Sequence, residues 1–443
     1  MEILLVNAPT KDSSTHTSDS PPLGLAYIAS VLRQNGYEVS ALDLNVSGLI
    51  DASFESILKQ GRPCILGISA HTQTYLTGLA IARMAKQINP ETKTIMGGTH
   101  PTVMFRDAAT DECIDIVVRG EGEYTMLELA DYLLRNKGSL AEIKGIAYQK
   151  DGTLRTTAGR PEITNLDQLP FPARELFPLP NYEFPGRILA SRGGCPFSCH
   201  FCAVNNIWKG ARRFRNPQKV VEEILCIFKN INNTKEIHFS DDTFTLNREH
   251  VMILCDLLKK MKQAFPWRWT CSTRVDLVDR KLLEKMHDAG CYFITFGVEA
   301  GSQEILNSIG KRITLEQVRK AVRECLEIGI GVHCFFMFPH PEDTQETIRA
   351  QKEFMREINN MGAGLSLSFT IPYPGTYYFE HADELGIKIL SNNWDDYDGS
   401  HLIITTTNLS EQCLIESYAE ISRDLGLWRM EKTTLFSKRI MHS

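Results

Sequence analysis

The sequence predicts an α/β protein that contains two parallel sheets in succession. Short apolar runs alternate with segments of helical spacing along most of the chain, and small or polar residues follow many of those runs. Strands that alternate with helices of this kind are typical of βαβ units and parallel sheets. The length of 443 residues is enough for two or three domains. Ligands of such sheets bind beyond the carboxyl ends of the strands.

The composition narrows the class of protein. Hydrophobic residues make up 43% of the chain and charged residues 23%, which is ordinary for a soluble globular protein. The net charge of −6 gives no basic surface for nucleic acid. No apolar run is long enough for a membrane span, and the first residues do not have the pattern of a signal peptide. Most of the twelve cysteines stand alone in apolar segments. We therefore expect a cytoplasmic protein with free thiols and neither a nucleic-acid partner nor a membrane span.

The first part of the chain, residues 1–150, alternates expected strands with helices. The expected strands are 2–8, 38–44, 64–69, 93–98 and 114–123, and the clearest helices are 23–37 and 74–88. Gly97 and Gly98 follow the fourth strand and permit a large ligand to approach the backbone closely. The alternative for each of these strand ends is an ordinary βα turn.

The second part of the chain predicts about six further βα units. Residues 151–185 are rich in proline and poor in periodic structure, so we expect a linker there. The expected strands are 186–192, 236–245, 268–278, 292–302, 331–344 and 364–376, and the expected helices are 217–231, 247–263, 279–289, 301–308, 314–328 and 344–359. Active sites of such barrels gather at the carboxyl ends of the strands.

A cysteine motif carries the clearest chemistry. The stretch "SRGGCPFSCHFCA", residues 191–203, holds Cys195, Cys199 and Cys202 in a C-x3-C-x2-C spacing. Cysteine thiolates bind iron–sulfur clusters, normally four to a [4Fe–4S] cluster, so three nearby thiolates imply one iron with an open position. A structural zinc site needs four closed positions, and no second pair of Cys or His with the right spacing follows. A non-catalytic redox or sensor protein with an iron–sulfur cluster is the alternative to an enzyme.

The motifs together resemble a known enzyme family. The cysteine loop, "STRVDL" and "FGVEAGS" are similar to the radical S-adenosylmethionine (SAM) superfamily. "PPLGLAYIASVLRQNGYEVSALDLN", "GISAHTQT", "GGTHPT" and "VVRGEGEYT" are similar to the cobalamin-binding domain that precedes many of its members. The resemblance implies a Rossmann-like, doubly wound cobalamin-type domain (1–150), a linker (151–185), a partial (β/α)6 TIM-type radical SAM barrel (186–376), and a C-terminal substrate-side or capping region (377–443).

The resemblance also implies which residues bind cofactors. The free iron of the cluster would chelate the amino and carboxylate groups of SAM, which the reduced cluster cleaves to a 5′-deoxyadenosyl radical. The residues implied for the SAM pocket are Asp241, Asp242, Ser272, Arg274 and Glu299. Those implied for cobalamin are Ser69 and Thr72 near its tail, and Gly97 and Gly98 along the slot for its base. No catalytic residue beyond these ligands is assigned.

Two motifs depart from the family pattern. Cobalamin domains of the methionine synthase type carry D-x-H-x-x-G after the first strand, whereas this chain has only "DLNVSG" (43–48), with Asn45 in place of His, after the second strand. We therefore expect bound cobalamin to lack a histidine ligand from the protein. Many members have a Gly-x-Pro-Gly-Glu turn after the fifth barrel strand, and this chain has "FPHPEDT" (338–344).

The resemblance favours cobalamin-dependent methyl transfer to an unactivated carbon, or to a phosphinate phosphorus. One SAM would methylate cob(I)alamin and a second would supply the radical. The alternative within enzymes is a radical rearrangement, cyclisation or oxidation without methyl transfer. The expected partners are a small-molecule or peptide substrate and an electron donor such as flavodoxin or ferredoxin. Residues 377–443 carry no readable motif. The polar, aromatic segment "WDDYDG" (394–399) predicts a surface loop, with a loop that contacts substrate as the alternative.

Overall fold

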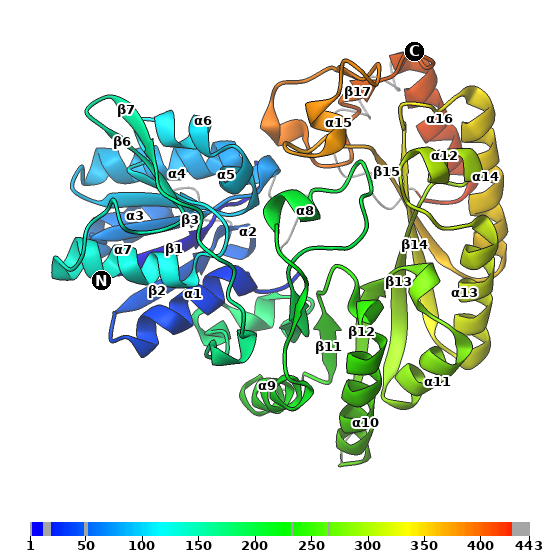
Figure 1. Cartoon of the computed structure of the whole chain (residues 1–443), viewed down its shortest axis with the longest axis horizontal. Coiled ribbons are helices and arrows are strands. Elements are labelled where there is room, and N and C mark those ends of the chain that lie inside the picture. Colours follow the sequence, from blue (N-terminus) through cyan, green and yellow to red (C-terminus); the bar gives the residue numbers. More distant parts are fainter. Residues whose placement is uncertain (1, 12–18, 48–51, 232–233, 265, 428–443) are drawn as a thin grey trace. The chain divides into compact units, whose positions relative to one another are not determined.

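The computed structural model describes residues 2–11, 19–47, 52–231, 234–264 and 266–427, and it divides into two compact units. The first unit contains residues 1–185 and 206–210, and the second contains residues 186–205 and 211–443 (Figure 1). Each unit is built around its own sheet.

The first unit contains seven strands and seven helices among the described residues. The strands are β1 (Ile3–Asn7), β2 (Val39–Asp43), β3 (Ile65–Ser69), β4 (Lys93–Gly97), β5 (Ile116–Val118), β6 (Ile146–Lys150) and β7 (Thr153–Thr156). The helices are α1 (Leu23–Gln34), α2 (Leu44–Ser47), α3 (Ala52–Gly61), α4 (Tyr75–Ile88), α5 (Thr99–Val103), α6 (Phe105–Thr110) and α7 (Glu123–Arg135).

The sheet of the first unit has the strand order β2-β1-β3-β4-β5-β6-β7. The first five strands in this order are parallel, and the direction of winding reverses between β1 and β3. Helices α1 and α7 pack together on one face, and α3 and α4 on the other (Figure 1). The predicted Rossmann-like, doubly wound fold is confirmed, and ligands of such sheets bind where the winding reverses.

Strands β6 and β7 form an antiparallel hairpin that the sequence analysis did not predict. Their turn contains Asp151 and Gly152, both with positive φ (51° and 69°). An Asp-Gly pair between two strands is a strong signal for a two-residue hairpin, because both central residues of that turn need positive φ. The signal was present in "QKDGTL" (149–154).

Burial explains why the apolar runs become strands here. Strands β1, β3, β4 and β5 are buried along nearly their whole length, as expected for a parallel sheet covered by helices on both faces. Leu25, Ala29 and Leu32 of α1 pack into the same core cluster as Met126 and Leu129 of α7. The spacing of three to four residues puts each set on one face of its helix.

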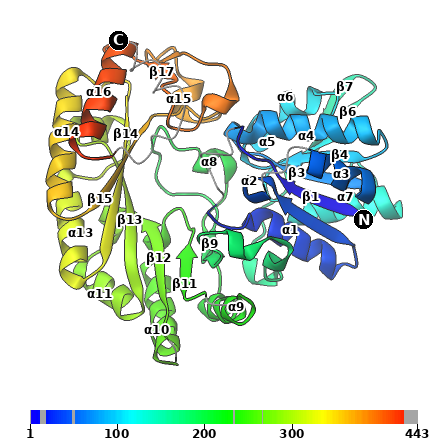
Figure 2. The same ribbon diagram turned by 180° about the vertical axis from the view of Figure 1, so that it is seen from behind.

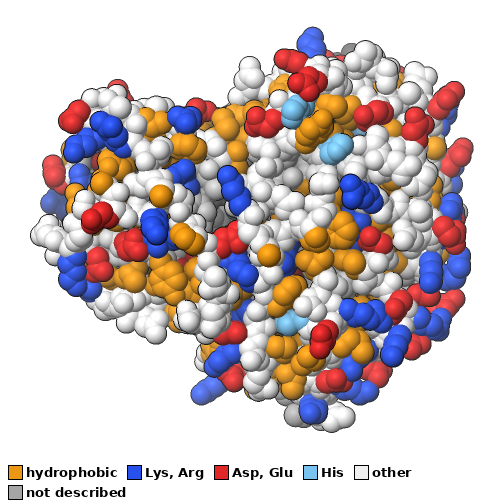
Figure 3. All heavy atoms as spheres, in the orientation of Figure 1, with side chains coloured by type: hydrophobic (Ala, Val, Ile, Leu, Met, Phe, Trp, Pro, Cys, Tyr) orange, Lys and Arg blue, Asp and Glu red, His pale blue; other side chains and the backbone are white. Residues whose placement is uncertain are grey.

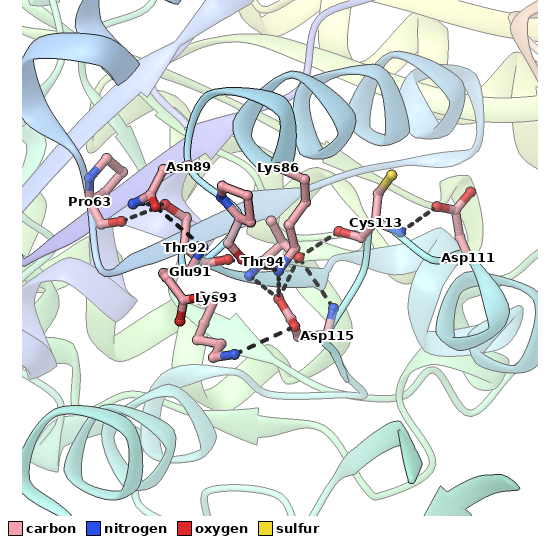
Figure 4. A network of polar contacts seen from close by, with 11 residues as sticks. Pro63, Lys86, Asn89, Glu91, Thr92, Lys93, Thr94, Asp111, Cys113 and Asp115 are labelled. Atoms are coloured by element: carbon pink, nitrogen blue, oxygen red, sulfur yellow. Dashed lines mark hydrogen bonds and ion pairs between the residues drawn. The ribbon is translucent and has the colours of Figure 1, made fainter. Parts of the chain in front are cut away.

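A polar network at the amino-terminal end of β4 and β5 fixes their register (Figure 4). Asp115 accepts hydrogen bonds from the amide and the hydroxyl of Thr94, at 2.7 and 2.9 Å, and pairs with Lys86 of α4 at 2.6 Å. Thr92 donates to the carbonyl of Pro63 at 2.9 Å. Because this network lies opposite the carboxyl ends of the strands, it stabilises the fold without occupying the ligand edge.

Residues 151–185, which we predicted to be a linker, belong to the first unit. The amide of Ala173 donates to the carbonyl of Ala26 at 3.0 Å, and the hydroxyl of Tyr182 donates to Asp43 at 3.0 Å. Ala173, Phe177 and Tyr182 are part of the core cluster. Proline-rich sequence indicates a lack of helix and strand, but such extended backbone can still insert single apolar side chains into a core.

The second unit contains ten strands and nine helices among the described residues, α8 reaching into residues 206–207. The strands are β8 (Arg187–Ile188), β9 (Ser191–Arg192), β10 (Arg213–Phe214), β11 (Glu236–Phe239), β12 (Arg268–Thr273), β13 (Cys291–Glu299), β14 (Gly331–Phe338), β15 (Gly364–Phe369), β16 (Lys388–Ile389) and β17 (Ile404–Thr405). The helices are α8 (Val204–Ile207), α9 (Pro217–Asn230), α10 (Arg248–Ala264), α11 (Arg280–Asp288), α12 (Gln303–Ser308), α13 (Leu315–Ile328), α14 (Gln345–Asn360), α15 (Tyr377–Glu380) and α16 (Glu411–Asp424).

The main sheet of the second unit is a curved, open half-barrel. Its strand order is β15-β14-β13-β12-β11-β8, every pair is parallel, and neighbours in the sheet follow one another in the chain. The helices between these strands line its outer face in Figures 1 and 2. The predicted partial (β/α)6 barrel is confirmed, and the carboxyl ends of all six strands therefore meet at one edge.

Local sequence signals account for the helix boundaries of this unit. Thr314 and Gln317 form a capping box at the start of α13, and Gly329, with φ of 96°, ends it. Between these limits Val318, Ala321, Val322 and Cys325 are buried. All twelve cysteines are free, and several are buried in this unit as expected for structural thiols: Cys255, Cys271, Cys291, Cys325 and Cys334.

On the face drawn in Figure 3, Lys and Arg side chains are interspersed with Asp and Glu. Within the residues that the structure describes, no helix combines the length and the apolarity that crossing a membrane requires.

The geometry of Gly97 and Gly98 predicts that substitution by alanine destabilises the protein at Gly98 but has little effect on stability at Gly97. A Cβ on Gly98 would lie 2.3 Å from the carbonyl oxygen of Ala70, and its φ of 110° with ψ of −172° is a region that only glycine adopts readily. Gly98→Ala should lower the free energy of unfolding by about 1–3 kcal/mol or more. A Cβ on Gly97 would meet only ordinary contacts, at 3.6 Å from Val118.

Urea unfolding followed by circular dichroism measures this difference. Gly97→Ala is the matched control and should change the free energy of unfolding by about 1 kcal/mol or less. Equal destabilisation by the two variants would contradict the backbone argument.

Candidate functional site

The three cysteines of the motif lie in a loop at the carboxyl-terminal edge of the half-barrel. The loop follows β9, which pairs with β10, and leads into α8. Cys195, Cys199 and Cys202 are all half-buried. No helix or strand spans the loop, so its conformation depends on side chains that reach it from elsewhere.

Asn205 of α8 binds the first half of the loop through its side chain. The amide of Cys195 donates to the side-chain oxygen of Asn205 at 2.8 Å, and the side-chain nitrogen of Asn205 donates to the carbonyl of Phe197 at 2.8 Å. The amide of Cys202 donates to the carbonyl of Cys199 at 3.1 Å. One asparagine thus satisfies backbone groups at two points of the loop.

The far side of the loop is held by two segments distant in sequence. The amide of His200 donates to the carbonyl of Ile309 at 3.0 Å, and the amide of Tyr378 donates to the carbonyl of His200 at 3.3 Å. A Cβ on Gly310 would lie 2.9 Å from the carbonyl oxygen of Ser198. The turn after α12 and the start of α15 therefore pack directly against the cysteines.

Arg274, at the end of β12, is turned toward this loop. Its guanidinium forms a bidentate ion pair with Asp276 at 2.9 and 3.0 Å and donates to the carbonyl of Lys311 at 2.7 Å. It stacks 3.7 Å from the centre of the Phe197 ring, and its Nη1 lies 4.0 Å from the sulfur of Cys199. We predicted that Arg274 lines a SAM pocket, whereas its contacts in the structure are with the cysteine loop and its supports.

Glu299, at the end of β13, pairs with Lys311 at 2.9 Å, and both side chains are mostly buried. Glu299 has φ of 75°, and the pairing of β13 with β14 shifts register between Gly297 and Glu299. Strained backbone of this kind is retained where the surroundings impose it, often at functional sites. Lys311 was missed by the sequence analysis, because nothing in "IGKR" (309–312) separates it from other lysines.

The two acidic residues predicted for the SAM pocket, Asp241 and Asp242, differ in how exposed they are. Asp241 is 2% exposed and accepts hydrogen bonds from the amide of Ala190, at 2.9 Å, and from the hydroxyl of Ser191. Burial raises the pKa of Asp241, and these hydrogen bonds oppose the rise. Each of its oxygens thus accepts a hydrogen bond from the chain between β8 and β9, and its predicted role in the SAM pocket stays a prediction.

Of these two acidic residues, Asp242 is the one that is accessible to a ligand. Its carboxylate pairs with Arg212 at 3.0 Å, and its side chain is about half exposed. Arg212 is buried and also donates to the carbonyl of Gly194 at 3.1 Å, so it anchors the start of the cysteine loop. Ser272, at the end of β12, is half-buried, and its hydroxyl forms no hydrogen bond within the described part of the chain.

The turn "FPHPEDT" (338–344), which replaces the usual Gly-x-Pro-Gly-Glu turn after the fifth barrel strand, packs against neighbouring residues through His340. His340 is fully buried; its Nδ1 lies 3.0 Å from the hydroxyl of Tyr378, and its amide donates to Asp343 at 2.7 Å. Its ring centre is 6.2 Å from that of Phe201. Burial lowers the pKa of His340 to about 4, so the ring is neutral at pH 7. The "FPHPEDT" turn therefore supports the back of the cysteine loop.

The thiols have the chemistry that an iron–sulfur cluster requires. Burial raises the pKa of Cys202 to about 11 and also raises that of Cys199, which nearby Lys311 and Arg274 partly oppose. A metal displaces the proton of a coordinating thiol, and neighbouring cations stabilise the thiolate. Three half-buried thiols in one loop are the kind of ligand that the irons of a cluster bind, so the donor set fits a cluster.

In the first unit, the residues predicted for cobalamin lie at the adjoining ends of β3 and β4. Ser69 ends β3 and is half-buried. Thr72 is buried and its hydroxyl lies 3.2 Å from His100. The close packing of Gly98 against Ala70 gives a backbone reason for this glycine, and its place along the cobalamin slot stays a prediction.

Two other side chains at this edge bear on the cobalt ligand. Asn45, which stands where the spacing would put a histidine, accepts from the amide of Thr10 at 3.1 Å and donates to the carbonyl of Ala8 at 3.2 Å. Its side chain is thus committed to the turn. His71 follows β3, is exposed, and has its Nδ1 2.9 Å from the hydroxyl of Thr99. The sequence analysis did not assign His71 to cobalamin.

The segment "WDDYDG" is not the surface loop that we predicted. Tyr397 is 1% exposed, and the amide of Phe369, at the end of β15, donates to the carbonyl of Gly399 at 2.8 Å. Asp398 accepts from Nδ1 of His401 at 3.0 Å, which raises the pKa of His401. The pair lies at the carboxyl end of β15, the edge that also carries Glu299. Residues 428–443 of the predicted C-terminal region lie outside the described residues.

Comparisons with known proteins agree with this arrangement. Residues 13–130 match the B12 binding domain family, and residues 191–355 match the Radical SAM superfamily. An uncharacterized methyltransferase of Pyrococcus horikoshii is 34% identical over 407 residues, which cover 90% of this chain and 86% of that protein. The anaerobic magnesium-protoporphyrin IX monomethyl ester cyclase of Rubrivivax gelatinosus is 28% identical over 85% of this chain and 68% of its own.

A solved structure has the same fold over nearly the whole chain. The radical SAM methyltransferase TsrM of Kitasatospora setae, solved with cobalamin and a [4Fe-4S] cluster bound, superposes with a TM-score of 0.75. It is 19% identical in sequence, and the match covers 95% of this chain and 91% of that one. With its two family domains in this order and a relative that is 34% identical over 90% of its length, the chain belongs to the radical SAM enzymes that carry an N-terminal B12-binding domain and use a [4Fe–4S] cluster, SAM and cobalamin.

Proposed function

We propose that this enzyme transfers a methyl group from SAM to an unactivated carbon of a small-molecule or peptide substrate. The observation that carries the proposal is the three-cysteine loop of Cys195, Cys199 and Cys202, backed by the Glu299–Lys311 pair at the carboxyl edge of a parallel half-barrel. A B12-binding unit in the same chain supplies the second cofactor site that such a transfer needs.

The residues of the half-barrel would bind the cluster and SAM. Cys195, Cys199 and Cys202 hold three irons of the cluster and leave the fourth for SAM. Ser272, Asp242 and Glu299 are the polar side chains of this edge that a bound SAM could reach. When bound, the reduced cluster supplies the electron that cleaves SAM, and the corrinoid supplies the methyl group.

The first unit would hold the corrinoid beside the ends of β3 and β4. Ser69 and Thr72 contribute hydroxyls there, and Gly97 leaves room without strain. We propose that the protein supplies no histidine to cobalt, because Asn45 is bound within its own turn. We also propose that the enzyme works in the cytoplasm, with an electron donor such as flavodoxin or ferredoxin.

Radical chemistry without methyl transfer is the second candidate, since the Rubrivivax gelatinosus relative is described as a cyclase. A non-catalytic electron carrier is a weaker one, because such a protein does not need the unpaired Ser272 hydroxyl and the strained Glu299 beside the cluster loop. The three candidates differ in the products that they make from SAM.

The products of SAM distinguish methyl transfer from the alternatives. The anaerobic protein, reconstituted with iron, sulfide and hydroxocobalamin and then reduced, should convert SAM to both 5′-deoxyadenosine and S-adenosylhomocysteine. Mass spectrometry with methyl-deuterated SAM measures both products. S-adenosylhomocysteine should disappear when cobalamin is omitted. Formation of 5′-deoxyadenosine alone would favour a rearrangement or cyclisation, and no SAM cleavage at all would favour an electron carrier.

Bound cobalamin should be base-off and free of an imidazole ligand. Electron paramagnetic resonance of the cob(II)alamin form should then lack superhyperfine splitting from nitrogen. Splitting from one nitrogen that is lost in His71→Ala would identify His71 as the ligand and overturn the expectation. Protein that carries a full cluster but binds no cobalamin would contradict the assignment of the first unit.

Each cysteine of the motif should be essential for the cluster. Reconstituted wild-type protein should bind about four irons and show the brown absorption of a [4Fe–4S] cluster. Cys195→Ala, Cys199→Ala and Cys202→Ala should each lose most of the iron, as measured by iron analysis and absorbance. Cys325→Ala, which removes a buried thiol of α13, is the control and should keep the cluster. A triple variant that retains four irons would contradict the ligand assignment.

A further inference from the structure

The side chain of Arg274 is directed at the cysteine loop by contacts on three sides. Two of its nitrogens bind the carboxylate of Asp276, one of them also donates to the carbonyl of Lys311, and the face of the guanidinium stacks on Phe197. Because the guanidinium is planar and rigid, these contacts determine the direction of the remaining nitrogen. That nitrogen, Nη1, lies 4.0 Å from the sulfur of Cys199.

We propose that Arg274 is a positioning residue that holds the Cys199 thiolate and raises the reduction potential of the cluster, while Asp276 limits that effect. The inference rests on the proposed function in one respect, since it assumes that the cysteines hold a cluster. It goes beyond that function because it assigns Arg274 to the cluster and not to SAM. It also assigns a role to Asp276, which belongs to the "STRVDL" motif but was given no function of its own by the sequence analysis.

The physical basis is electrostatic. Reduction adds one negative charge to the cluster, so a nearby cation stabilises the reduced form and raises the potential. Arg274 is buried, and charges interact more strongly where water is excluded. An arginine remains charged at any physiological pH, so its effect is permanent. The Asp276 carboxylate carries the opposite charge on the far side of the guanidinium and therefore lowers the potential.

The other cations near the loop are arranged differently. Lys311 pairs with Glu299, and its ammonium is 5.9 Å from the centre of the Phe201 ring. Arg212 pairs with Asp242 and donates to the carbonyl of Gly194. Arg274 differs from these two in that one of its nitrogens lies 4.0 Å from the sulfur of Cys199. This contact distinguishes it from Arg212, which holds the backbone of the loop, and the charge of Lys311 also acts on the Cys199 thiol.

A role in tuning the potential and a merely structural role lead to different results. If Arg274 and Asp276 only stabilise the loop, loss of either one should loosen the cysteines in the same way, and both variants should change together. If their charges act on the cluster, removal of the cation should lower the potential and removal of the anion should raise it. The sign of the two shifts is therefore decisive.

The experiment is a potentiometric titration of the full-length protein, reconstituted with iron and sulfide and monitored by electron paramagnetic resonance of the reduced cluster. Arg274→Gln should shift the potential to more negative values, on the order of tenfold less reduced cluster at a fixed potential, or about 59 mV for one electron. Asp276→Asn should shift it to more positive values. Arg274→Lys keeps the charge and should recover most of the wild-type potential.

Arg280→Gln is the matched control. Arg280 lies on α11, pairs with Glu284 and Glu327, and is about half exposed, so its loss should leave the potential unchanged. Iron analysis of every variant verifies that the cluster is complete. If Arg274→Gln loses iron, the comparison of Asp276→Asn and Arg274→Lys with the wild type still reports the effect of charge.

The outcomes separate this inference from the proposed function. Unchanged potentials in variants with a full cluster, or shifts of Arg274→Gln and Asp276→Asn in the same direction, would overturn the role of Arg274 and leave the proposed function intact. A wild-type protein that binds no cluster would overturn the proposed function and this inference with it.

Discussion

The architecture of this enzyme depends on a single constraint: parallel strands that follow one another in a sheet all end at the same edge. The cysteine loop has no helix or strand of its own and takes its shape from this edge. The turn after α12, the end of β12 and the start of α15 are separated by tens of residues in sequence, yet each contacts the loop directly. A site assembled in this way exists only when the half-barrel is complete.

The charges at this edge are arranged as buried or half-buried pairs. Arg274 with Asp276, Lys311 with Glu299, and Arg212 with Asp242 each place a cation near the cysteines with its own anion beside it. Pairing offsets the cost of burial, which is severe for an isolated charge. It also leaves each of these pairs with no net charge. The same pairs hold the loop and set its electrostatic surroundings.

In the first unit, a residue at the edge where ligands bind can be required for the backbone conformation. Gly98 cannot carry a side chain because Ala70 lies against it, whatever ligand binds nearby. Asp241 in the second unit is similar, since its carboxylate accepts hydrogen bonds from Ala190 and Ser191 in the chain between β8 and β9. A small or acidic residue at a strand end is therefore weak evidence of a ligand contact until its neighbours are known.

The sequence by itself determined the order of strands and helices, the two family domains and the three cysteines, because periodicity and local spacing are properties of adjacent residues. It also contained the Asp151-Gly152 hairpin signal, which the analysis passed over. Only the tertiary structure decided that residues 151–185 pack into the first unit, that Tyr397 is buried, and that Lys311 faces Glu299. Those facts could not be read from the sequence, because each depends on which distant segments the sheet brings together, and no local pattern encodes a contact between residues far apart in the chain.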